Sequence, residues 1–458
     1  METRKPKLLF LICIMLGSAV LVMSNEPTST AGSPSALPTT IKIGYLHPAT
    51  GELSAYELDK GGLLAEEVVN TAGGRGGWNG TLDVIFEDTA TDPTVTDAAT
   101  KKLIETDSVE VIVGAAGSSN TLAAGKVCAQ NNVPIVSYAS TSPAITTEGG
   151  EWVFRVVGSD ELQGWALAEA ALALGYSKAA LIYLDNAYGI GMADVFYEYF
   201  VGGGGEVVDE FKYLASATSF ATEMTKIKSL ADAGDIDCIM DTSYADDGAL
   251  IFTEGATQGI TTPWLCAEGV ADAKIFNVTS GVGAAMEGMR GTKPLSFEDS
   301  PEWQAFNASY YAKYGTAQNI YGDYAYDAVM LVLDAIIHAG EYDGTAIKNA
   351  LPTVANGWVG ASGDKTMDAN GDVGQDYIIW EVTEPTTGNF EFTKLGDWNF
   401  LTGASFVVDG VTKTHHGTER TPRPEEEEDS PGFMMVVALI SLAGSASLII
   451  RRRRRLLR

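Results

Sequence analysis

The chain has 458 residues and carries 60 acidic against 30 basic residues, which gives a formal net charge of −30 at pH 7. This length suits one large or two medium domains. So acidic a chain excludes nucleic acid as a partner, because phosphates require a basic surface. Its four cysteines are too few and too scattered for a disulfide framework or a zinc site.

The N-terminal segment has the pattern of an export signal. Arg4, Lys5 and Lys7 precede an apolar run over residues 8–23. A basic start followed by such a run is typical of a secretory signal peptide. Because a clean small-residue cleavage site is missing, residues 1–24 are predicted to be either a signal peptide or a signal anchor.

The C-terminal segment has three parts in order: Pro431-Gly432-Phe433, an apolar run to residue 450, and arginines at 451–455. The apolar run is long enough to cross a bilayer core, and the arginines would stay on the cytoplasmic side. Residues 431–458 resemble the PGF-CTERM sorting signal of archaeal surface proteins, in which the helix is removed and replaced by a lipid. The alternative is a retained transmembrane helix. Both alternatives predict anchoring on the extracellular face of the cell membrane.

The region between these ends alternates strand-like and helix-like stretches. A Pro/Ser/Thr-rich linker at 25–40 comes first. Strands are then predicted at 41–46, 81–87, 109–113 and 133–136, and helices at 55–71, 94–105 and from the turn after 113 to 130. This order predicts a parallel sheet that is covered on both faces.

From residue 160 the same rhythm begins again. Helices are predicted at 161–174, 189–200, 219–233 and up to about 257, and strands at 179–184, 206–213, 236–241 and 263–266. Helices at 301–314 and 321–339 and hairpin strands at 366–383 and 390–395 complete the order. Two series of similar size predict two α/β lobes, followed by an acidic tail linker at 409–430.

One strand-to-helix turn concentrates polar side chains. In the stretch VIVGAAGSSNTLAAG (111–125), the apolar strand ends at a glycine, and Ser118, Ser119, Asn120 and Thr121 precede an Ala-rich helix. Ligands bind at the ends of such strands in α/β sheets. The free N–H groups of the helix start favour an anion such as a carboxylate. The alternative is that these side chains only cap the helix.

Other suggestive patterns are better explained without a cofactor, a metal or a reaction. Glycines at 73–77 and 202–205 lie between a helix and the following strand, the reverse of a dinucleotide fingerprint. The stretch 368–372 begins like a calcium loop, but Val373 replaces the required glycine, and Asn370-Gly371 is typical of a hairpin turn. No nucleophile elbow or zinc-protease motif occurs. We therefore expect no enzyme, no cofactor and no metal site.

A series of short motifs carries a family resemblance. They are IKIG (41–44), TG (50–51), Asp88 with Asp92-Pro93, VG with SS (113–119), PIV with ASTSP (134–143), Phe154-Arg155, Asp160, Gln163-Gly164, Tyr188-Gly189, Glu268-Gly269 and Tyr326-Asp327-Ala328. In this order and spacing, residues 41–396 resemble the leucine/isoleucine/valine-binding proteins, the extracellular receptors of ABC amino-acid importers.

The resemblance implies the type I periplasmic-binding fold: two Rossmann-like lobes joined by three crossovers near 158–160, 289–293 and 355–360. One lobe would comprise 41–159 with 292–356, and the other 160–291 with 357–408. An amino-acid ligand would bind between the lobes, and their closure would present a surface to the ABC permease subunits in the membrane.

The resemblance also implies a set of ligand-binding residues. They are Tyr56, Ser118, Ser119, Ala139, Thr141, Asp160, Tyr188, Tyr244, Glu268 and Tyr326. Ser118 matches the serine that receives the ligand carboxylate, and Thr141 the threonine that contacts both ligand ends. The Ala139 carbonyl and the Glu268 carboxylate match the partners of the ammonium. Asp160 and Asp185 are the alternative acids for that role.

The chain departs from the family in one respect and leaves two questions open. A disulfide that is common in bacterial members falls on Thr91 and Gly117, so the Ser118 loop is expected to be held by packing alone. The tyrosines suit an aliphatic, polar or aromatic ligand side chain. The alternative function is a surface sensor ectodomain of the same fold for an amino acid or amide.

Overall fold

The structure, a computed structural model, describes residues 37–423. The predicted signal at 1–24, most of the linker at 25–40, the end of the tail linker and the sorting signal at 431–458 lie outside these residues. Across 37–423 we find no helix that is both long enough and apolar enough to span a bilayer.

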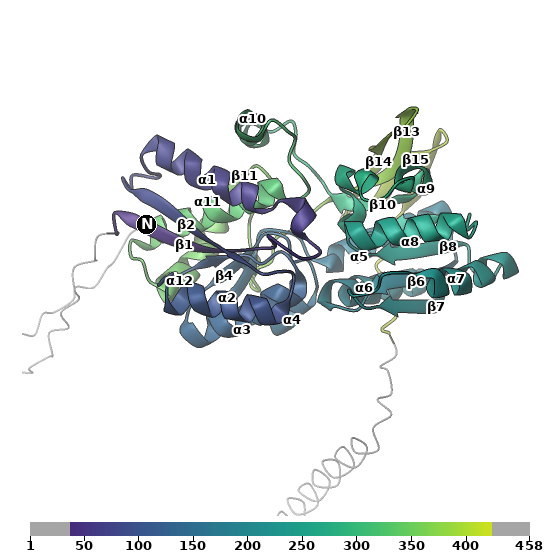
Figure 1. Ribbon diagram of the computed structural model, residues 1–458, viewed down its shortest axis with the longest axis horizontal. Coiled ribbons are helices and arrows are strands. Elements are labelled where there is room, and N and C mark those ends of the chain that lie inside the picture. Colours follow the sequence, from purple (N-terminus) through teal and green to yellow (C-terminus); the bar gives the residue numbers. More distant parts are fainter. Residues whose placement is uncertain (1–36, 424–458) are drawn as a thin grey trace, which may run out of the picture. The chain divides into compact units, whose positions relative to one another are not determined.

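The first lobe is built on a five-stranded parallel sheet in the order β2-β1-β3-β4-β5 (Figure 1). Its strands are β1 (Thr40–His47), β2 (Thr81–Asp88), β3 (Ile112–Val113), β4 (Ile135–Ser137) and β5 (Val153–Arg155). Residues 41 and 43–46 of β1 are all buried, as expected for a central strand covered on both faces. The predicted strand at 109–113 is reduced to two residues in the ladder.

Helices cover this sheet in two groups. α1 and α11 pack against each other, as do α2 and α3 (Figure 1). The helices of the first lobe are α1 (Asp59–Ala72), α2 (Pro93–Glu105), α3 (Ser118–Asn131), α4 (Ala144–Glu148), α10 (Pro301–Tyr314), α11 (Gly322–Ala339) and α12 (Gly344–Ala355), with the 3-10 turn η1 (Ser54–Tyr56). Asp92 starts α2 by accepting hydrogen bonds from two backbone N–H groups of its first turn, and Pro93 follows at the first helical position.

The second lobe is built on a nine-stranded mixed sheet in the order β16-β15-β14-β13-β10-β9-β8-β6-β7. The strands β6 (Lys178–Leu184), β7 (Glu206–Tyr213), β8 (Cys238–Thr242), β9 (Trp264–Cys266) and β10 (Arg290–Pro294) pair in parallel. An antiparallel meander of β13 (Tyr377–Thr386), β14 (Asn389–Asn399), β15 (Gly403–Val408) and β16 (Val411–His415) extends it. The helices are α5 (Asp160–Leu174), α6 (Ala187–Gly202), α7 (Ala221–Ala233), α8 (Ala245–Thr257) and α9 (Val282–Met286), with η2 (Glu268–Val270) and η3 (Ala273–Asn277).

The chain passes between the two sheets three times. It does so between β5 and α5, between β10 and α10, and between α12 and β13. The expected lobe boundary at 291/292 falls inside β10, which is one continuous strand of the second sheet. The short strands β11 (Val359–Gly360) and β12 (Gly363–Asp364) pair with each other, and the backbone N–H groups of Ala361 and Ser362 between them donate to Asp327 of α11.

Two C-terminal expectations change in the structure. The strand predicted from 366 begins at Tyr377, because residues 368–372 form a tight turn in which Gly371 has a φ of 82°. Asn370-Gly371 thus lies in a turn as expected, but the turn spans five residues and is closed by an isolated bridge between Met367 and Val373 rather than joining two strands as a two-residue hairpin. The tail linker predicted from 409 begins later, because β16 adds a further strand to the sheet.

Residues 403–423, which comprise β15, β16 and the segment after them, dock on α5 and α6, and we call them the C-terminal strap. The buried carboxylate of Glu169 on α5 accepts hydrogen bonds from the backbone N–H groups of Ala404 and Gly417 and from the Trp398 indole. Arg420 then pairs with acidic side chains of both α5 and α6. The strap is therefore part of the second lobe.

Candidate functional site

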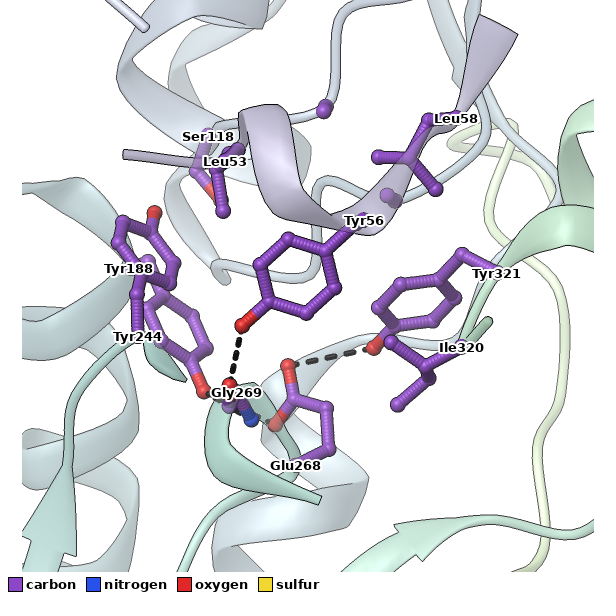
Figure 2. A pocket seen from close by; sticks show the side chains of 12 residues that line it. Leu53, Tyr56, Leu58, Ser118, Tyr188, Tyr244, Glu268, Gly269, Ile320 and Tyr321 are labelled. Atoms are coloured by element: carbon purple, nitrogen blue, oxygen red, sulfur yellow. Dashed lines mark hydrogen bonds between the residues drawn. The ribbon is translucent and has the colours of Figure 1, made fainter. Parts of the chain in front are cut away.

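The candidate site lies where strands of both sheets end. Tyr56 follows β1, Ser118 follows β3, Tyr188 follows β6, Tyr244 follows β8 and Glu268 follows β9. The carboxyl ends of parallel strands lie at one edge of a sheet, which is where α/β folds bind ligands. These five residues line one pocket, together with Leu53, Leu58, Ala116, Ala139, Gly269, Ile320 and Tyr321 (Figure 2).

One end of the pocket offers hydrogen-bond donors. Ser118 is the first residue of α3, it is buried, and its hydroxyl accepts from the backbone N–H of Ser142. The helix is preceded by Gly117, which provides no capping side chain. The Ser118 hydroxyl is therefore not used as a cap. A hydroxyl beside a helix N-terminus suits a carboxylate.

Hydroxyl groups, rather than packing alone, hold this loop. Thr121 accepts from the backbone N–H of Ala115 and bonds the Ser140 hydroxyl at 2.7 Å. Ser137 and Ser140 both donate to the carbonyl of Ala115. The Ser118 loop is therefore held by hydrogen bonds as well as by packing, which corrects the expectation from the sequence. Thr121 is thus a structural residue and not a ligand contact.

Arg155 supports the adjacent loop from below. It is fully buried, and its guanidinium donates to the carbonyls of Thr141 and Ser142 at 2.9 and 3.0 Å. Its Nε donates to Asp372 at 2.6 Å. A buried arginine is stable only when its donors are used in this way. It positions the loop without entering the pocket.

The opposite end of the pocket is acidic. Glu268 is 3% exposed, and its carboxylate accepts from the hydroxyls of Tyr188 at 3.0 Å and Tyr321 at 3.2 Å (Figure 2). Burial raises the pKa of Glu268 to about 7, although these tyrosine hydrogen bonds act to lower the pKa. An ammonium group would restore the charged form of this carboxylate.

Tyrosines join the two lobes across the pocket. The Tyr56 hydroxyl, from the first lobe, donates to the carbonyl of Gly269 in the second lobe (Figure 2). It also accepts from the backbone N–H of Ala245, again in the second lobe, at 3.2 Å. The rings of Tyr188 and Tyr244 stack with centroids 5.4 Å apart. Ring faces and polar tips therefore surround a closed pocket.

Further contacts between the lobes flank the pocket. Ser119 accepts from the backbone N–H of Ala187 at 3.1 Å, and Asp272 accepts from the backbone N–H of Ile320 at 2.9 Å. Lys274 donates to the carbonyl of Ala55 at 2.6 Å. The cavity that these side chains leave is about 30 Å³, which is room for about one water molecule. The lining side chains must therefore move apart before a ligand enters.

Four predicted residues lie outside the pocket lining. The hydroxyl of Ser119 bridges the lobes, whereas Thr141 and Asp160 are buried and adjoin the site through the hydrogen bond from the Asp160 N–H to the Thr141 carbonyl at 2.7 Å. The Tyr326 ring instead packs on Phe306, with centroids 5.2 Å apart. The pocket is therefore lined by Tyr321 and not, as expected from the sequence, by Tyr326.

The backbone conformation explains why Tyr321 and not Tyr326 lines the pocket. Tyr321 precedes α11 with a φ of 69°, which sets its direction apart from that of the helix. Tyr326 lies inside the helix, where a shift of five residues turns a side chain to another face. The aromatic position before the helix was the available signal. The remaining residues that sequence reasoning missed are apolar neighbours such as Leu53 and Leu58, which flank Tyr56.

Known proteins resemble this chain over most of the described residues. A family model described as a periplasmic binding protein matches residues 40–389. The leucine-, isoleucine-, valine-, threonine- and alanine-binding protein of Pseudomonas aeruginosa is 29% identical over 353 residues, which cover 76% of this chain and 91% of that relative.

Solved structures give the same picture. A leucine-binding protein from Thermotoga maritima is 27% identical with a TM-score of 0.69, and the match covers 77% of this chain and 97% of that one. A branched-chain amino acid transporter substrate-binding protein from Streptococcus pneumoniae, solved with isoleucine, is 25% identical with a TM-score of 0.67, covering 78% and 99%.

Proposed function

Because the chain belongs to the periplasmic binding protein family, we propose that it is the extracellular solute receptor of an ABC importer and binds an L-amino acid between its lobes. The observation that carries the proposal is one pocket with a buried carboxylate, Glu268, at one end and the Ser118 hydroxyl beside a helix start at the other. A zwitterion needs an acid for its ammonium and donors for its carboxylate, because both charges lose water when they are buried.

The residue roles follow from this polarity. Ser118 and the first N–H groups of α3 receive the ligand carboxylate, and the Thr141 hydroxyl and Ala139 carbonyl assist at the centre. Glu268 receives the ammonium, and the hydrogen bonds from Tyr188 and Tyr321 orient the Glu268 carboxylate. Tyr56 and Tyr244 close the pocket from the two lobes, and Ser119 links the lobes at its edge.

The ligand side chain is proposed to be aliphatic. The pocket walls include Leu53, Leu58, Ala116 and Ile320, none of which offers a polar side chain. The Pseudomonas relative is named for binding leucine, isoleucine, valine, threonine and alanine, and the Streptococcus structure holds isoleucine. A small apolar side chain therefore fits both the walls and the relatives.

The lobes are proposed to divide the chain at the three observed crossings. The first lobe comprises β1–β5 with α10–α12, and the second begins at α5, includes all of β10 and ends with the C-terminal strap. The pocket is closed, and closure would present surfaces of both lobes to the permease subunits.

The protein is proposed to work on the extracellular face of the cell membrane. Residues 1–24 would direct export, and residues 431–458 would anchor the chain, either through a lipid after PGF-CTERM-type processing or as a helix. Mass spectrometry of the native protein tests whether residues 431–458 are processed as a sorting signal. Recovery of an intact peptide containing the arginines at 451–455 contradicts processing and leaves the transmembrane helix.

The binding proposal is tested by thermal unfolding of the full chain with single ligands. We expect leucine, isoleucine or valine to raise the melting temperature, because ligand at 100 times its dissociation constant adds about 2.7 kcal/mol of stability. The same acids without their amino group serve as controls. A shift with a sugar or nucleotide, and none with any amino acid, would contradict the ligand class.

A further inference from the structure

The acidic end of the pocket holds more acceptors than donors. Among residues 37–423, no donor has full hydrogen-bond geometry with the Oε1 of Gln163 or with either carboxylate oxygen of Asp160, and the one donor beside Asp160 is the Thr141 hydroxyl, which acts to lower the pKa of Asp160. Asp160 and Gln163 are both 0% exposed. They are three positions apart on α5 and so share one face of the helix. Buried acceptors without donors are costly and call for an explanation.

These acceptors adjoin Glu268. The Gln163 amide donates to Thr292 at 3.2 Å and also interacts with the Glu268 carboxylate. Asp160 and Glu268 repel each other, and this repulsion is the largest influence on the pKa of Asp160 after burial; both influences raise it. Two fully buried carboxyl groups therefore share one polar cluster.

The other polar groups around the pair do not neutralise it. From the neighbouring elements, it is faced by Thr141 after β4, Arg155 on β5, Tyr188 on α6, Tyr244 before α8, Tyr321 before α11 and Tyr377 on β13. The only cation among them is Arg155. Its guanidinium donors are used by Asp372, Thr146 and loop carbonyls. Tyr188 and Tyr321 donate to Glu268, Tyr377 donates to the carbonyl of Ser159, and the Tyr244 hydroxyl accepts from Asn186, so none of these hydrogen bonds reaches Asp160.

We propose that Asp160 and Glu268 form one two-carboxyl cation subsite, which holds a proton when no cation is bound and releases a proton to solvent when the ligand ammonium enters. Asp160 is thereby assigned as a second residue that selects for a cationic ligand group. This inference rests on the proposed function for its ligand and extends it to a proton exchange.

The asymmetry of the pair explains the exchange. Glu268 has two tyrosine donors and ionises first, with a pKa of about 7, whereas Asp160 has a pKa well above its ordinary value. Coupled carboxyl groups lose their protons in two steps that belong to the pair. An ammonium brings one positive charge and three N–H donors, so it favours the ionised pair. The O–H bond of the carboxyl group breaks, its electron pair stays on the oxygen as a carboxylate, and the proton passes to solvent.

The first test counts protons during binding. Leucine, isoleucine or valine is titrated into the full chain by calorimetry at pH 7 in two buffers of different ionisation enthalpy. We expect release of about half a proton per ligand at pH 7, where Glu268 is about half ionised, and of close to one when the titration is repeated at pH 6; the dissociation constant should fall by up to about tenfold per pH unit between pH 6 and 7. Asp160→Asn should release fewer protons. Asp185→Asn, which changes a carboxylate paired with Lys212 outside the cluster, should release as many as the native chain.

The second test needs no ligand. Groups whose pKa is raised in the folded state bind more protons when folded, so their stability contribution is lost as pH rises from about 4 toward the folded pKa. Denaturant unfolding of the native chain should therefore show lower stability at pH 8 than at pH 5. Asp160→Asn and Glu268→Gln should each shrink this loss. Their two reductions should add up to more than that of the double variant, because each substitution also relieves the other carboxyl group.

The outcomes separate the two proposals. If no amino acid binds but the ligand-free reductions are non-additive, the shared subsite stands and the proposed function fails. If an amino acid binds with no proton release between pH 6 and 8, or if the ligand-free reductions are additive, the two carboxyl groups act independently and the inference is overturned.

Discussion

The two ends of the pocket differ in how completely their polar groups are satisfied. At the Ser118 end, the hydroxyls of Ser137, Thr121 and Ser140 are all hydrogen-bonded to the loop that they support. At the Glu268 end, the carboxylate of Asp160 has no hydrogen bond of full geometry within the described part of the chain and only the Thr141 hydroxyl beside it. The first end is therefore preformed for an anion, whereas the second is completed only by a cation or a proton.

This difference also separates the lobes. The donor end belongs to the first lobe and is organised by backbone carbonyls and neutral hydroxyls. The acidic end belongs to the second lobe, where burial raises the pKa of both carboxyl groups. A ligand that contains both charges is held by both ends at once, so it favours the closed arrangement of the lobes.

The largest expected effect comes from breaking the support of the donor end. Arg155→Met removes a buried cation and strands the loop carbonyls of Thr141 and Ser142, so we expect the free energy of unfolding to fall by about 3 kcal/mol. Urea unfolding measures the change. The control is Arg420→Met, whose exposed ion pairs should cost less than about 1 kcal/mol. Equal losses in both variants would contradict the supporting role of Arg155.

The next effect breaks the acidic end. Glu268→Gln keeps the shape and removes the charge, so affinity for the amino acid should fall roughly 10- to 1,000-fold. Its affinity for the analogue without an amino group should change much less. Calorimetry with both ligands makes this comparison, with the exposed Glu105→Gln as the control. If Glu268→Gln weakens both ligands equally, Glu268 is not the partner of the ammonium.

A smaller loss of affinity is expected when the Ser118 hydroxyl is removed from the donor end. Ser118→Ala removes one hydrogen bond to a charged carboxylate, so affinity should fall by about 1.5–3 kcal/mol. Because the carboxylate is present in both ligands, the amino acid and its deaminated analogue should lose affinity to the same extent. Thr121→Ser keeps the supporting hydroxyl in the same loop and should leave both affinities close to native. Weakening confined to the amino acid would place Ser118 at the wrong end of the ligand.

The smallest effect distinguishes Tyr321 from Tyr326. Tyr321→Phe removes a donor to Glu268 and should weaken amino-acid binding by about 0.5–1.5 kcal/mol. Tyr326→Phe keeps a ring that packs on Phe306 outside the pocket, so binding should stay unchanged. Parallel calorimetric titrations decide between them. A larger loss for Tyr326→Phe would return that residue to the site.

Local pattern predicted the order of strands and helices, because buried parallel strands and amphipathic helices have distinct periods. It did not predict that β13 begins at Tyr377 or that β16 extends the sheet, since pairing with a distant strand decides where a ladder begins and ends. The family resemblance placed Glu268 and Ser118 at one pocket. The exchange of Tyr326 for Tyr321 depends on a left-handed backbone conformation that residue types do not reveal.

The C-terminal strap has a mechanical consequence. Its ion pairs fasten Arg420 and Arg423 to α5, α6 and β7, all of which belong to the second lobe. A force applied to the chain at Arg423 therefore acts on the second lobe alone. Under the proposed anchoring through residues 431–458, the second lobe would be held in place, and opening and closing would move the first lobe, with Ser118, relative to Glu268.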